Sequence, residues 1–192
     1  DPLTMNLSVT SSGADTIRPD LAFDVQNNLW AAVYELAFNA ADHDVYVQSF
    51  FDSGTLYQTL AIDLTTANWQ TPHIANCRSG SQFLVVATVG NTPTREIDAV
   101  RLDATTFLAQ PPVRLDSFPG DKLDPDVGGD PANSVVGAFA VVWTRVFSAT
   151  DRDVHGRLVY TDGTMSGLNE AQLDNTSNTL DERPRISNAC GI

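Results

Sequence analysis

Short apolar runs and polar, turn-rich stretches alternate along this chain, and the alternation repeats. Each unit opens on a phrase built around a proline: Pro19, Pro72, Pro125 and Pro184, which are 53, 53 and 59 residues apart. A fixed period of this size marks a repeat architecture. The sequence therefore predicts three similar units and the beginning of a fourth.

Each unit continues with an apolar run that is too short for a typical helix and rich in β-branched and aromatic side chains: residues 30–34, 83–87 and 139–143. Such a run, bounded by turn formers, predicts a strand buried on both faces. An acid and an alternating stretch follow at 44–48, 96–101 and 153–158, which predicts a strand with one less buried face. A looser outer segment ends each unit at 61–64, 112–116 and 171–174.

Four short strands per unit predict an all-β fold, namely a β-propeller or propeller fragment with four-stranded antiparallel blades repeating every 53–59 residues. Helical solenoids require amphipathic helices, and the sequence has none. A sandwich is the competing all-β fold, but it does not explain three copies in register.

The predicted boundaries follow from the repeat, and the two ends are interpreted as parts of further blades. Residues 1–16 are expected to form the outer strand of a preceding blade, and residues 182–192 the first strand of a following one. The whole blades are 17–69, 70–122 and 123–181. We expect a piece of a larger propeller, or a protomer that completes its ring with another chain as a homo-oligomer.

The chain has 24 acids and 11 bases, a net charge of −13. This charge argues against nucleic acid and against an anionic membrane surface as partners, because both require a positive surface. No apolar run approaches the length of a membrane span, so membrane insertion is not expected. Two cysteines, Cys77 and Cys190, allow one disulfide. Because they are expected two blades apart, a bond between them is disfavoured.

The phrase Asp44-Val45-Tyr46-Val47-Gln48, followed by Phe50 and Asp52, shows the order of the repeat best. It resembles the tandem β-propeller repeats of large secreted or cell-surface bacterial proteins, broadly of the sialidase-like and Tol-type propellers. The resemblance implies an exported protein, secreted or at the cell surface or in the periplasm, and a binding or scaffolding role.

The chain departs from the enzymatic members of that group. Sialidases carry Asp-box turns of the form Ser-x-Asp-x-Gly-x-Thr-Trp, and the sequence has only fragments of one. Their arginine cluster would have to come from residues such as Arg18, Arg78, Arg95 or Arg101, and no local motif selects among them.

Pairs of acids are expected in the turn before each third strand: Asp42 and Asp44, Glu96 and Asp98, Asp151 and Asp153. Closely spaced carboxylates supply the oxygen ligands that Ca²⁺ prefers. Asp also accepts backbone N–H bonds in tight turns, and repetition in every blade favours that role of turn cap. Calcium is the only cofactor for which the sequence provides candidate ligands.

A second acidic stretch lies around the insertion in the third unit and is interpreted as a solvated linker, with a ligand or metal role as the alternative: Asp116, Asp121, Asp124, Asp126 and Asp130. His43, His73 and His155 are too scattered to predict a zinc site and are expected to lie on the surface or to pack between blades. Tyr34, beside Glu35, is expected to be a structural aromatic that matches Trp143.

Because no blade differs from the others in its chemistry, the first hypothesis is a non-catalytic binding or scaffolding module of a larger exported protein. A protein or glycan ligand would lie in the loops of one face or in the central channel. The alternatives are a glycan-processing hydrolase, sialidase-like or five-bladed, with part of its site in other blades, and a calcium-stabilised structural surface repeat.

Overall fold

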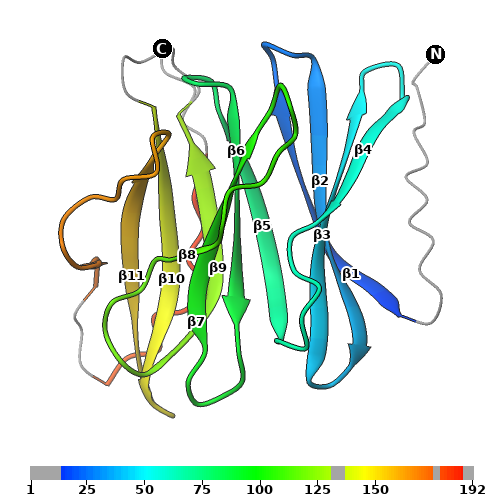
Figure 1. Cartoon of the computed structure of the whole chain (residues 1–192). Coiled ribbons are helices and arrows are strands. Elements are labelled where there is room, and N and C mark those ends of the chain that lie inside the picture. The colour runs from blue at the N-terminus through cyan, green and yellow to red at the C-terminus, as the bar shows by residue number, and fades with distance from the viewer. Residues whose placement is uncertain (1–13, 131–136, 175–177, 188–192) are drawn as a thin grey trace.

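The computed structural model describes residues 14–130, 137–174 and 178–187, which form strands and turns without any helix among them. Three antiparallel four-stranded sheets follow one another along the chain, each with its strands in sequence order. Figure 1 shows the sheets side by side in the same order as in the sequence. The predicted all-β fold with four-stranded antiparallel blades is confirmed.

The strands of blade 1 are β1 (Asp15–Asp24), β2 (Leu29–Asn39), β3 (Asp42–Phe51) and β4 (Leu56–Ala61). Those of blade 2 are β5 (Trp69–Cys77), β6 (Gln82–Val89), β7 (Glu96–Asp103) and β8 (Val113–Arg114). Blade 3 consists of β9 (Asp121–Gly129), β10 (Ala138–Ser148), β11 (Asp151–Tyr160) and β12 (Ala171–Gln172).

The apolar runs form the second strands, as predicted, and they are buried on both faces. Ala31 and Val33 point to one side of β2 and Ala32 and Tyr34 to the other, and all four are almost completely covered. One prediction for blade 1 was wrong. Its outer strand is β4, which ends at Ala61, whereas the outer segment was expected at 61–64, after that strand.

Two apolar layers fill the junctions between blades. The layer between blades 1 and 2 includes Val33, Val85 and Phe107, and the layer between blades 2 and 3 includes Phe139 and Trp143. These side chains are buried almost completely, so the hydrophobic effect is the main force that holds neighbouring blades together.

The first strands of the blades contact one another, with β5 between β1 and β9. The contact between β5 and β9 is close, because a Cβ atom at Gly129 would lie only 1.8 Å from the carbonyl oxygen of Asn76. Residues 182–187 extend the row beyond β9. The amide of Ile186 donates to Asp126 Oδ2 at 2.8 Å, and the amide of Arg183 donates to Thr144 Oγ1 at 3.0 Å.

The repeated prolines lie within the first strands, which begin three or four residues before them. In each blade the pairing with the second strand skips the proline and the residue before it, as in a β-bulge. That preceding residue has a positive φ in all four phrases: 52° at Arg18, 50° at Thr71, 50° at Asp124 and 56° at Arg183. Positive φ is uncommon outside glycine and costs energy unless neighbouring contacts stabilise it.

Some sequence predictions fall outside or at the edge of the described residues. Cys77 is buried with a free thiol, whereas Cys190 lies outside the described part of the chain. The same holds for part of the insertion in the third unit, 131–133. Among the described residues, no helix has the length and apolar character needed to cross a bilayer.

Candidate functional site

A groove of about 640 Å³ runs along the first strands, where a propeller has its central channel. It is lined from β1, β5 and β9 and from the 182–187 segment. A second hollow of about 380 Å³ adjoins it at the bulges and shares His73 and Arg185 with it. We call these two cavities together the channel groove.

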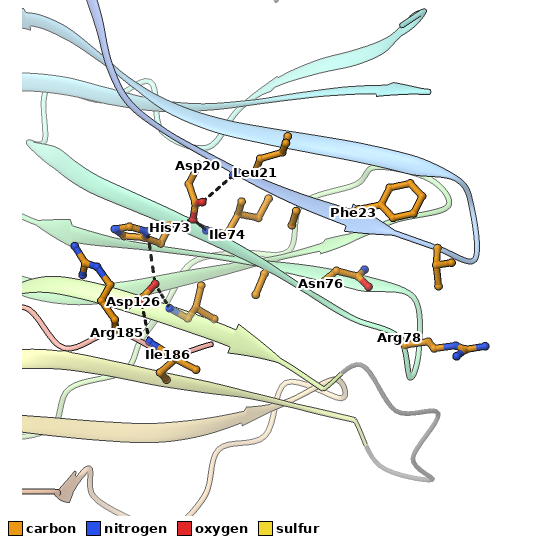
Figure 2. Close-up of a pocket in the computed structure, with 14 residues that line it drawn as sticks. Asp20, Leu21, Phe23, His73, Ile74, Asn76, Arg78, Asp126, Arg185 and Ile186 are labelled. Atoms are coloured by element: carbon orange, nitrogen blue, oxygen red, sulfur yellow. Dashed lines mark hydrogen bonds and ion pairs between the residues drawn. The ribbon is translucent and has the colours of Figure 1, made fainter. Parts of the chain in front are cut away.

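Four residues that occupy the equivalent position in successive repeats all line the channel groove. Directly after the proline, the four phrases have Asp20, His73, Asp126 and Arg185, and all four line the larger cavity. His73 Nδ1 lies 3.1 Å from Asp20 Oδ2 and 3.6 Å from Asp126 Oδ1. Figure 2 shows the imidazole between the two carboxylates, with Arg185 beside it.

The two carboxylates are also bound by the backbone. Asp20 Oδ2 accepts the amide of Ile74 at 3.0 Å, and its Oδ1 accepts the amide of Leu21 at 2.8 Å. Burial tends to raise the pKa of Asp20, but the hydrogen bonds from His73, Ile74 and Leu21 outweigh it, so this pKa is lowered. Asp20 is therefore an ionised structural acceptor at neutral pH.

Glu35 stabilises the backbone at the bulges of β1 and β5 through hydrogen bonds. Its wholly buried carboxylate accepts two hydrogen bonds from Arg18 Nη1, at 2.9 and 2.7 Å, and one from the amide of Thr71 at 2.9 Å. It also contacts His43 Nδ1. The residues just before the prolines of blades 1 and 2 are thus fixed by one acid. This explains how Arg18 and Thr71 tolerate positive φ.

Most basic side chains have partners elsewhere. Among the described residues, five form ion pairs with carboxylates: Arg18, Arg95, Arg114, Lys122 and Arg152. Three more donate to the backbone carbonyls of residues distant in sequence: Arg101, Arg145 and Arg157. The remaining three are exposed, contact no carboxylate within the described chain, and all line the channel groove: Arg78, Arg183 and Arg185.

Arg78 lies apart from the other two arginines along the groove. Figure 2 shows Arg78 near one end and Arg185 near the other, where Arg183 lines the adjoining hollow. Within the described part of the chain, the guanidinium of Arg185 bonds only to the carbonyl of the preceding Pro184, at 2.9 Å. In a chain of net charge −13, the basic groups available to a ligand are therefore concentrated in this groove.

The acid pairs predicted from the sequence lie on the third strands, away from the channel groove. Asp42, Glu96 and Asp151 are the first residues of these strands, so Asp44, Asp98 and Asp153 lie within them and not in the preceding turn. Among the described residues, no three ligating groups converge closely enough to hold a metal ion. Calcium binding by these acids stays a prediction.

Burial changes the acidity of two of these acids. It raises the pKa of Asp44 to about 6, with further increases from the charges of Asp63 and Asp42. Burial likewise raises the pKa of Asp98 to about 6, together with Glu96 and Asp116 and against an opposing effect of Arg114. At Asp98 the charge of Arg114 offsets this rise only in part, and no cation of the described chain forms an ion pair with Asp44.

Three of the four remaining acids of the pairs have structural contacts. Glu96 pairs with Arg114, Asp151 Oδ1 accepts the amide of Asn178 at 3.1 Å, and Asp153 Oδ2 accepts Gln172 Nε2 at 2.6 Å. In the second acidic stretch, Asp124 and Asp126 line the channel groove. Asp116 and Asp121 instead bind basic residues between blades 2 and 3.

The combination of His73 with Arg183 and Arg185 was not predicted from the sequence. The signal was present in the opening phrases themselves, because the position after the proline changes from Asp to His to Asp to Arg along the four copies. The interpretation that no blade differs from the others overlooked this position. His43 and His155 are buried, as expected for packing residues.

Comparisons with known proteins agree with the fold. The structure is similar to a microbial sialidase, Hadza microbial sialidase Hz136, with a TM-score of 0.55 and 13% identity, over 82% of this chain and 37% of that one. It is also similar to the hemagglutinin-neuraminidase ectodomain of parainfluenza virus 5, with a TM-score of 0.51 and 10% identity, over 79% and 42% of the two chains. The fold is that of a β-propeller.

The chain spans less than half of the length of these two solved structures. No family model matches the sequence, and no curated protein matches it. At such low identity the likeness concerns the fold alone, so the function must be argued from the channel groove.

Proposed function

We propose that this chain is a non-catalytic binding module for an acidic glycan, which lies along the channel groove. The observation that carries the proposal is that Arg78, Arg183 and Arg185, the three basic side chains that bind neither a carboxylate nor a distant backbone carbonyl among the described residues, all line this groove. Arginine binds carboxylates through two parallel hydrogen bonds, so separated arginines suit a chain that carries carboxylates at intervals.

The remaining lining supports a sugar ligand. Asn76 and His73 offer hydrogen-bonding groups, while Leu21 and Phe23 supply apolar surface. Ligand sites typically combine apolar walls with a few placed polar groups. A nucleic acid would also be anionic, but the net charge of −13 disfavours a long phosphate backbone outside the groove. The two structural neighbours are named as a sialidase and a hemagglutinin-neuraminidase, names that refer to glycans.

A glycan ligand fits the expectation of an exported parent protein, because acidic glycans are abundant outside cells. We propose the same location for this module, secreted or at the cell surface. Further blades of the parent polypeptide, or a second protomer, would complete the ring around the groove.

A hydrolase is the second candidate, and one observation favours it. Asp20 and Asp126 both approach His73 Nδ1, at 3.1 and 3.6 Å, so two carboxylates lie close together in one groove. Glycosidases use paired carboxylates about 5–9.5 Å apart. However, Asp20 accepts from Ile74 and Asp126 Oδ2 accepts from Ile186, and this use of both acids as backbone acceptors favours a structural role.

Titration calorimetry of the whole chain with hexagalacturonate and with neutral maltohexaose tests the proposal. We expect binding of the acidic hexasaccharide only, and a loss of about tenfold or more in affinity for Arg78→Gln combined with Arg185→Gln. Arg145→Gln combined with Arg152→Gln is the matched control, because it removes the same two charges from residues outside the groove.

Two outcomes would contradict the proposal. One is equal binding of the neutral and acidic hexasaccharides, and the other is an equal effect of the control and groove variants. Release of the fluorophore from a fluorogenic sialoside, lost in Asp126→Asn, would instead establish the hydrolase.

A further inference from the structure

One junction lacks a contact that the repeat makes elsewhere. In the other junctions, the aspartate that follows the proline of one unit accepts a hydrogen bond from a backbone amide of the next unit, two residues after that unit's proline. Asp20 Oδ2 accepts the amide of Ile74 at 3.0 Å, and Asp126 Oδ2 accepts the amide of Ile186 at 2.8 Å. At the junction of blades 2 and 3 the corresponding residue is His73. The amide of Val127 instead donates to the neighbouring Asp126 Oδ1, at 3.0 Å.

A carboxylate at position 73 would permit the same inter-blade hydrogen bond as in the other junctions. The chain has an imidazole there, and this is the position that faces the channel groove between Asp20 and Asp126. Departures from a local structural rule are expected at functional sites, where a side chain is retained for another purpose. The replacement of the structural acid by His73 therefore indicates a functional role for this side chain.

The geometry assigns different tasks to the two ring nitrogens. Nδ1 faces two carboxylate acceptors, at 3.1 and 3.6 Å, so it carries a proton. Nε2 forms no hydrogen bond with any described residue, and 25% of the side chain is exposed. Since His73 lines both cavities of the groove, Nε2 is the nitrogen available to a ligand.

Charged groups surround the ring on every side. Asp20 approaches from β1 and Asp126 from β9, while Arg183 and Arg185 lie on the 182–187 segment. The other charged residues of the smaller cavity are Asp124 and Arg18, and Arg18 is neutralised by Glu35. The imidazole of His73 therefore lies between two groups of charged residues. Asp20 and Asp126 already accept backbone amides, and Arg183 and Arg185 have no acid partner among the described residues.

We propose that His73 is the proton-dependent contact of the ligand: in its doubly protonated form, Nε2 donates a hydrogen bond to a carboxylate of the acidic glycan beside Arg185. In the singly protonated form, Nε2 presents a lone pair that repels the same carboxylate. Histidine is the side chain that ordinarily changes charge between about pH 5 and 8. The module then binds its ligand more tightly in acidic surroundings. This inference rests on the proposed function.

Calorimetry with hexagalacturonate from pH 5 to 8 tests the inference, because the sugar carboxylates stay ionised over this range. We expect affinity to fall roughly tenfold between pH 5.5 and 8, the size of one charge-assisted hydrogen bond. Repeating the titration near pH 7 in buffers of different ionisation enthalpy should reveal uptake of up to one proton per ligand bound.

His73→Gln keeps a neutral donor near the position of Nε2 and cannot take up the proton. We expect a pH-independent affinity and no proton uptake for this variant, with its fold checked by thermal melting. If it fails to fold, the proton uptake of the unaltered chain and the imidazole signals in its NMR spectrum still decide the question.

The outcomes separate the two proposals. Binding of hexagalacturonate with neither pH dependence nor proton uptake would overturn the role of His73 and leave the proposed function standing. Full pH dependence in His73→Gln would overturn that role in the same way. Absence of binding at every pH would refute the proposed function, and the inference with it.

Discussion

The two junctions between blades bury similar apolar layers but use different polar contacts. Between blades 1 and 2, the polar contacts lie at the first strands: Glu35 binds Arg18 and the amide of Thr71, and Asp20 binds the amide of Ile74. These contacts fix the bulges beside the channel groove directly.

Between blades 2 and 3, the polar contacts lie on the linker that joins the blades and on the first two residues of β9, Asp121 and Lys122. The wholly buried Lys122 pairs with Asp116 at 2.6 Å, and Arg157 donates to the carbonyl of Leu115 at 2.9 Å. Glu170 accepts the amide of Ser117 from the other side of the linker. A network of this kind stabilises the junction through the linker and the start of β9, without using position 73 of β5.

The different polar contacts of the two junctions explain how the same repeat can serve a structural role at one junction and a binding role at the other. Where the linker and the start of β9 supply the polar contacts, β5 can hold an imidazole in place of a structural acid. At this junction the amide of Val127 binds Asp126 and does not need an acceptor at position 73. Variants that weaken each junction should therefore affect stability and ligand binding differently.

The largest effect is expected from Asp116→Asn. This change leaves the buried Lys122 without its carboxylate, and breaking a buried ion pair costs about 3–5 kcal/mol of unfolding free energy. The side chain of Arg18 is 47% exposed, so Glu35→Gln at the other junction should cost less, about 2 kcal/mol. Urea denaturation followed by tryptophan fluorescence measures both.

The double variant Asp116→Asn with Lys122→Met provides the control for that prediction. It removes the unpaired buried ammonium, so it should recover more than half of the stability lost by Asp116→Asn alone. A double variant as unstable as the single one would show that Lys122 is not the reason for the loss.

An intermediate effect is expected from Asp98→Asn in blade 2. The pKa of Asp98 is raised to about 6, mainly by burial, so the folded chain binds more protons than the unfolded chain between about pH 4 and 6. Stability is then greatest below pH 4 for this group and falls as the pH rises towards 6. The variant should be about 1 kcal/mol more stable at pH 7.5 and should lose this pH dependence, as measured by urea denaturation at several pH values.

Asp103→Asn is the control of opposite sign. Hydrogen bonds from the amides of Thr106 and Thr105 lower the pKa of Asp103, so its stabilising effect is present above its unfolded pKa and disappears as the pH falls. This variant should be less stable than the parent at pH 7.5. Equal responses of the two variants would contradict the assignment of Asp98 as a buried, destabilising acid.

The smallest effect is expected from Thr144→Val. It removes the acceptor of the Arg183 amide. The free energy of local opening of the 182–187 segment should fall by about 0.5–1 kcal/mol, with little change in the free energy of global unfolding. Hydrogen exchange should show faster exchange of the Arg183 amide alone. Thr88→Val at the matching position of blade 2 should leave that amide unchanged, and faster exchange there would contradict a purely local role.

The periodic pattern of the sequence was sufficient to predict the strands and their grouping. The burial of residues 83–87 and 139–143 follows from composition and run length, because a short β-branched run between turns has few other ways to exclude water. The prolines marked the first strands, although the positive φ of Arg18 and its counterparts was not evident from the sequence.

The chemistry of the channel groove depended on which equivalent positions the fold brings together. The sequence alone determined that Asp20, His73, Asp126 and Arg185 occupy one repeat position. Only the tertiary structure decided that these side chains face one groove while Asp44 and Asp98 lie on third strands away from it. The physical reason is that period and composition report local burial, whereas a site arises where separate strands bring their side chains together across blades.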